Sequence, residues 1–154
     1  MDGLPPIRCT IDGGGHAMPQ LYLLSILANI VAGLTLAGDY LGERFAFLAS
    51  FKNLRENRPA QIIVALFSVV VGLLKLIILS PGETVPVAGD LLPALAGIVV
   101  GGTLLIEAFR QKVASSGENI EKLSKAVLSY RVPVGIAGVC IALLHFLFPG
   151  AVIL

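Results

Sequence analysis

Hydrophobic residues along this chain gather in four long runs and do not alternate with polar residues. The runs cover residues 21–41, 59–79, 91–109 and 132–154, and each lacks strong charge over most of its length. A helix needs about 20 residues to cross the roughly 30 Å hydrocarbon core of a bilayer. Continuous runs of this length indicate helices, because a membrane barrel has alternating strands. The pattern therefore predicts four transmembrane helices.

The first and third runs have nearly the same sequence. Residues 23–36 read LLSILANIVAGLTL, and residues 91–104, which lie 68 positions later, read LLPALAGIVVGGTL, with nine of fourteen positions identical. A period of this size is typical of a duplicated structural unit. Since each copy also holds two apolar runs, the duplicated unit is predicted to be a membrane helix hairpin.

Two helices return the chain to the side of the membrane where it started, so both hairpins enter in the same orientation as parallel repeats. We expect an all-α integral membrane protein with four transmembrane helices built from two tandem parallel-repeat helix hairpins. The expected single membrane domain is residues 18–154, with repeat 1 at about 21–88 and repeat 2 at about 89–154. Residues 1–17, rich in Pro and Gly, are expected to be a disordered tail.

The composition agrees with a membrane protein, and the distribution of charge predicts its orientation in the membrane. Only 14% of the 154 residues are charged, against about 25% in soluble domains. Nine of the eleven Lys and Arg residues fall in the two loops that follow the first and third runs. The positive-inside rule places these loops in the cytoplasm and both termini on the non-cytoplasmic side. We expect an integral protein of the bacterial inner membrane.

Both basic loops contain apolar residues at helical spacing. The first has Phe45, Leu48 and Phe51, and the second has Ile120, Leu123 and Val127. Apolar stripes beside basic residues favour short amphipathic helices in the membrane interface, and docking on a partner protein is the alternative.

The repeat aligns two threonines and two acidic residues. Thr35 corresponds to Thr103 and Asp39 to Glu107, and each hydroxyl lies four residues before its carboxylate, on the same helix face. A two-fold axis brings two such faces together, where paired carboxylates bind a cation or share a proton. Both acids also lie near the predicted cytoplasmic interface, so solvation or pairing with an arginine three to five residues further on is the alternative.

Other polar and small residues in the runs have more general roles. Gly33, Gly97 and Gly101 are expected to allow close helix packing, and Asn29 to form an interhelical hydrogen bond. A further pair, Lys75 and His145, lies near the outer helix ends and forms a candidate outer gate.

The sequence contains no pattern of catalytic residues, no metal-ligand spacing and no phosphate-binding loop, so we expect no enzyme activity, metal or cofactor. The expected partners are the lipid bilayer and a homo-oligomer or larger membrane complex, without nucleic acid. Two functions follow as hypotheses. The first is an oligomer-forming or accessory membrane subunit without catalytic chemistry. The alternative is an oligomeric channel or carrier for a cation or proton that uses Asp39 and Glu107.

Overall fold

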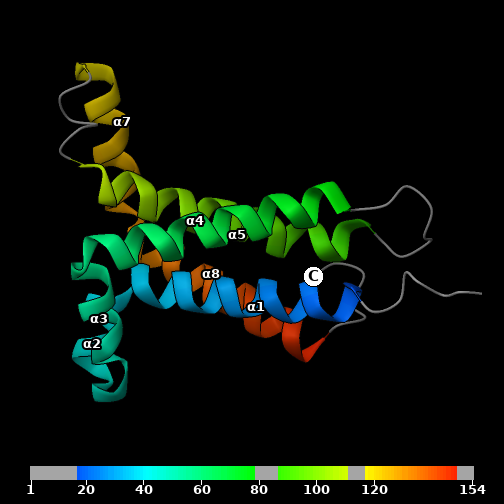
Figure 1. Cartoon of the computed structure of the whole chain (residues 1–154). Coiled ribbons are helices and arrows are strands. Elements are labelled where there is room, and N and C mark those ends of the chain that lie inside the picture. Colours follow the sequence, from blue (N-terminus) through cyan, green and yellow to red (C-terminus); the bar gives the residue numbers. More distant parts are fainter. Residues whose placement is uncertain (1–16, 79–86, 111–116, 149–154) are drawn as a thin grey trace, which may run out of the picture.

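The computed structural model describes residues 17–78, 87–110 and 117–148, and every element within these ranges is helical (Figure 1). The elements are α1 (Ala17–Leu36), α2 (Gly38–Arg44), η1 (Ala46–Leu48), α3 (Ala49–Glu56), α4 (Arg58–Ile78), α5 (Val87–Ala108), α7 (Glu118–Ser129) and α8 (Arg131–Leu147). The predicted all-α class is therefore confirmed for the described residues. The tail predicted at residues 1–17 lies outside them, apart from its last residue.

Two to four of these helices can cross a membrane by length and composition. Two qualify alone, α4 over Arg58–Ile77 and α5 over Leu91–Ala108. The other two qualify as bent pairs, in which α1 continues into α2 across an 80° bend and α7 into α8 across a 54° bend. The 21 residues of α4 span about 31 Å, close to the thickness of the hydrocarbon core.

The long helices form a bundle in which α1 and α5 are central. These two helices contact each other, and each also contacts both α4 and α8. Small and branched apolar side chains fill the space between them, and the core comprises Ala32, Leu36, Ala65, Val100 and Leu104. Thus the two helices that share the repeated sequence supply most of the buried core.

Glycines permit close contact between neighbouring helices of the bundle. A Cβ on Gly33 of α1 would lie 2.6 Å from the carbonyl oxygen of Gly135 on α8. A Cβ on Gly101 of α5 would lie 2.8 Å from the carbonyl oxygen of Ala65 on α4. Because these distances are too short for a side chain, α1–α8 and α5–α4 approach backbone to backbone.

Short helices project from one end of the bundle, which we call the arm end (Figure 1). The first arm comprises α2, η1 and α3 (residues 38–56), and the second arm is α7 (residues 118–129). The arms extend away from the bundle axis on opposite sides, while α1 begins and α8 ends at the other end (Figure 1). Gly117 precedes the second arm with φ 134°, a backbone conformation that favours glycine. The loop helices that the apolar stripes predicted are therefore present.

Candidate functional site

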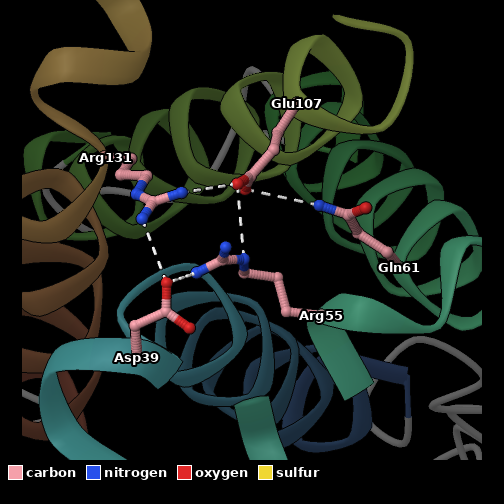
Figure 2. Close-up of polar contacts among 5 residues, drawn as sticks. All are labelled: Asp39, Arg55, Gln61, Glu107 and Arg131. Atoms are coloured by element: carbon pink, nitrogen blue, oxygen red, sulfur yellow. Dashed lines mark hydrogen bonds and ion pairs between the residues drawn. The ribbon is translucent and has the colours of Figure 1, made fainter. Parts of the chain in front are cut away.

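Asp39 and Glu107 lie close together at the arm end, although they belong to different helices (Figure 2). Asp39 is near the start of α2, and Glu107 is near the end of α5. The two carboxylates therefore lie near each other, as expected. In the first copy, however, the acid does not lie on the helix that carries its threonine. Because α1 ends at Leu36 and the chain bends by 80°, Asp39 is not on the same helix as Thr35.

The first arm packs closely on itself at the bend before Asp39. Gly38 lies against the backbone of α3, and a Cβ there would approach the nitrogen of Lys52 to 3.0 Å. The first arm therefore folds back onto its own beginning at the point where the helix axis turns by 80°. In the second copy, Thr103 and Glu107 share α5.

Two arginines bridge the carboxylates (Figure 2). Arg131 Nη2 lies 3.0 Å from Asp39 Oδ2, and its Nη1 lies 2.8 Å from Glu107 Oε1. Arg55 pairs with Asp39 through Nη1, and its Nε lies 3.3 Å from Glu107 Oε1. Gln61 donates a longer hydrogen bond of 3.4 Å to Glu107 Oε2. Each guanidinium thus contacts both acids.

This set of five residues, the ion-pair network, is partly shielded from solvent. The Glu107 side chain is 13% exposed and that of Arg55 17%, whereas Asp39 and Arg131 are about twice as exposed. Two positive charges balance two negative ones at hydrogen-bonding distance, so the carboxylates attract a further cation only weakly. The arrangement is suited to joining helices: it connects α2 and α3 of the first arm with α4, α5 and the start of α8.

The arginines in the network are not the ones that lie nearest to Asp39 and Glu107 in the sequence. Arg44 lies over the Tyr40 ring, 5.0 Å from its centroid, and Arg110 lines a cavity beside the network. Sequence reasoning did not select Arg55, Gln61 or Arg131. One signal was present in the sequence, since Gln61 lies near the start of the second apolar run and Arg131 directly precedes the fourth. Both side chains reach Glu107.

The two threonines are buried and their hydroxyls are used within their own helices. Thr35 Oγ1 donates to Val31 O and Thr103 Oγ1 to Val99 O, both at 2.7 Å. These bonds to the carbonyl four residues earlier satisfy the hydroxyl protons in the apolar interior. The threonines therefore occupy matching positions in the core, outside the ion-pair network.

Asn29 and Gly97 meet in the middle of the bundle, where the predicted interhelical hydrogen bond occurs. Asn29 Nδ2 donates to Pro93 O at 2.8 Å, and a Cβ on Gly97 would lie 2.8 Å from Asn29 Oδ1. Ser68 Oγ of α4 donates to Gly97 O at 3.0 Å. Glycine at position 97 therefore leaves room for the asparagine side chain.

The candidate outer-gate residues, Lys75 and His145, are brought together at the end opposite the arms. Lys75 Nζ lies 3.3 Å from His145 Nε2, and both residues are buried. Tyr22, which the sequence did not single out, covers them: its ring lies 4.8 Å from the imidazole and 5.5 Å from the ammonium group. The outer polar cluster thus comprises Tyr22, Lys75 and His145.

A cavity of about 670 Å³ lies between α5, the second arm and α8. Its polar lining includes Glu107, Arg110, Glu121, Ser124, Lys125 and Arg131. It therefore adjoins the ion-pair network through Glu107 and Arg131. Within the described ranges, no three His, Cys, Asp or Glu side chains are grouped to hold a metal ion.

Comparison with known proteins gives a family and no function. A model of an uncharacterised protein family matches residues 18–145. No curated protein and no solved structure matches the sequence.

Proposed function

The chain belongs to the uncharacterised family whose model spans residues 18–145, and we propose that it is a structural subunit of a membrane assembly. In this role it forms an oligomer or joins a larger membrane complex, and it carries no catalytic chemistry, metal or cofactor. The supporting observation is that two arginines hold both candidate carboxylates, Asp39 and Glu107. Because the arginine charges balance those of the two carboxylates, these acids join helices and do not form an open cation site.

The proposed membrane placement has four spans, α1, α4, α5 and α8, with both termini on the non-cytoplasmic side of a bacterial inner membrane. Two observations support it. Both arms leave the same end of the bundle (Figure 1), and most of the lysines and arginines lie on or beside them. A basic end faces the cytoplasm under the positive-inside rule, and arms directed away from the bundle axis suit the membrane interface.

The proposed duplication of a parallel hairpin is supported by contacts that match between the copies. Gly33 and Gly101 are 68 residues apart, and each faces a carbonyl oxygen and a valine of the neighbouring helix at similar distances. The residues that they face, Gly135 and Val139 on α8 and Ala65 and Val69 on α4, are 70 positions apart in the sequence. Lys75 and His145 are also 70 apart and touch each other, as residues beside a two-fold axis do. The second helices have therefore shifted by two residues relative to the first.

The ion-pair network gives the structural role a physical basis. It joins two residues of the first arm to the end of α5 and to the start of α8, where the second arm turns into the bundle. Charged hydrogen bonds with restricted solvent access fix geometry more strongly than exposed pairs do. The bundle thus presents two arms in a defined orientation to neighbouring subunits.

The mass of the particle tests this proposal. The full-length chain is extracted in mild detergent and measured by light scattering with correction for bound detergent. We expect a particle containing two or more copies of the 16.1 kDa chain. A monomer that gives neither homotypic nor heterotypic crosslinks in native membranes contradicts the structural-subunit role.

One observation favours the alternative, an oligomeric channel or carrier for a cation or proton. Buried polar residues continue from Lys75 and His145 at one end through Asn29 and Ser68 to Gln61 near Glu107. Such residues in membrane helices often mark a pathway. Liposomes containing the wild type and the Asp39→Asn/Glu107→Gln variant separate the two functions. Ion or proton flux that this variant abolishes favours transport, and absence of flux in the wild type contradicts it.

A further inference from the structure

The cavity beside the second arm has an excess of positive charge. Three of its lining side chains are cationic (Arg110, Lys125 and Arg131) and two are acidic (Glu107 and Glu121). Arg131 and Lys125 each have an acidic partner, at 2.8 and 2.6 Å. Among the residues that the structure describes, none forms an ion pair with Arg110. The cavity is therefore suited to an anion.

The pair between Lys125 and Glu121 does not close the cavity. The Lys125 side chain is 74% exposed, and its partner is four residues earlier on the same helix. Exposed pairs of this kind are weak. Lys125 can therefore turn toward a stronger anionic partner, whereas Arg131 stays bound within the ion-pair network.

Apolar side chains adjoin the cationic ones. Leu128 of the second arm lines the cavity, and the exposed Phe109 directly precedes Arg110 just after α5. A water-soluble anion makes no use of such neighbours, whereas a lipid places its headgroup beside cations and its acyl chains beside apolar groups. The volume of about 670 Å³ lies in the range of small-molecule sites.

We propose that this cavity binds the phosphate headgroup of an acidic phospholipid from the cytoplasmic leaflet, with Arg110 and Lys125 as the principal contacts. Basic pockets at the cytoplasmic ends of membrane helices take such headgroups. The site rests on the membrane placement proposed above and goes beyond the structural role. Carbonate extraction of membranes tests insertion separately, so failure of the site and failure of the placement are distinguishable.

Native mass spectrometry of the full-length chain tests the site. The protein is titrated with phosphatidylglycerol in phosphatidylcholine–detergent micelles and, separately, with inorganic phosphate. The test variant is Arg110→Gln/Lys125→Gln. The control variant, Arg44→Gln/Lys122→Gln, loses the same charge, and its Lys122 forms an equivalent exposed pair with Glu118 at 2.7 Å.

We expect selective phosphatidylglycerol binding that weakens about fivefold for each cavity cation removed, and near-wild-type binding in the control variant. Equal weakening in both variants indicates diffuse surface attraction and overturns the site, as does equal affinity for phosphatidylcholine. If inorganic phosphate binds the cavity as tightly as the lipid, a lipid headgroup is not the specific ligand. Unchanged thermal unfolding in both variants excludes loss of fold as the cause.

Discussion

At the residue scale, Glu107 is the most shielded acid in the ion-pair network and contacts both arginines. Glu107→Gln keeps the shape of the side chain but removes its charge, which leaves Arg55 and Arg131 to share Asp39. We expect the free energy of unfolding to fall by about 1–3 kcal/mol, the range for lost charged hydrogen bonds. Thermal unfolding in detergent measures it.

The matched control is Glu121→Gln in the second arm. Glu121 has an exposed ion pair with Lys125 at 2.6 Å, so its loss is expected to lower stability by about 0–1 kcal/mol. If both variants unfold at the same temperature, the network contributes no more than a surface pair and the structural argument for it fails.

Two adjacent glycines on α5 provide a second test at this scale. A Cβ on Gly101 would lie 2.8 Å from a carbonyl oxygen of α4, whereas a Cβ on Gly102 would meet nothing within 4 Å. Gly101→Ala is expected to destabilise the bundle by about 1–3 kcal/mol through overpacking. Gly102→Ala is expected to be neutral or to stabilise by up to about 1 kcal/mol through helix propensity. Equal unfolding temperatures contradict the close contact.

The position of the two carboxylates was predictable from the sequence, but their arginine partners were not. The repeat placed Asp39 opposite Glu107, because equivalent positions in a duplicated unit approach each other near its axis. Their arginine partners were not predictable, because Arg55 and Arg131 reach them only after the chain has turned away from the bundle and back. The arginines nearest to the two acids in sequence are Arg44 and Arg110. Sequence distance does not reveal the 80° bend that separates the first arm from α1.

At the scale of elements, apolar periodicity predicted the loop helices, and residues 38–56 and 118–129 contain them. It did not predict that the helix of the first apolar run ends at Leu36, because the run extends to Leu41 with Asp39 as its one charged residue. At that break Gly38 contacts α3, a tertiary contact that periodicity does not report.

The position of the first arm in the membrane interface is testable because the chain contains no tryptophan. Phe47 is 77% exposed and Glu56, near the other end of the arm, is also exposed. Phe47→Trp in liposomes is expected to emit at shorter wavelength than Glu56→Trp and to be quenched by brominated lipids. Equal emission and quenching at the two positions show that the arm does not present Phe47 to lipid.

At the scale of the whole molecule, helix neighbours do not follow the hairpin order. The central pair is α1 and α5, which come from different copies of the repeated sequence, and the glycine contacts join α1 to α8 and α5 to α4. The repeat keeps a glycine at positions 33 and 101, and these glycines were expected to allow close helix packing. The choice of neighbours could not be predicted, because every long helix is apolar and lipid accepts any of their faces.

The proposed topology makes a last prediction, which concerns the side of the membrane reached by each end of the bundle. In a Cys9→Ser/Cys140→Ser background, single cysteines are introduced as Gln20→Cys, Glu56→Cys or Glu118→Cys. All three positions are exposed. A membrane-impermeant maleimide applied to intact cells is expected to label position 20 alone, and positions 56 and 118 only after permeabilisation.

The comparison of positions 56 and 118 is the decisive one, because α4 and α5 lie between them. If both helices cross the membrane, the two positions share a side whichever way the bundle is oriented. Labelling of both from outside inverts the proposed orientation but keeps the parallel hairpins. Labelling of only one from outside requires an odd number of crossings between them. In that case the parallel-hairpin architecture is wrong, since the two arms that leave one end of the bundle then lie on opposite sides of the membrane.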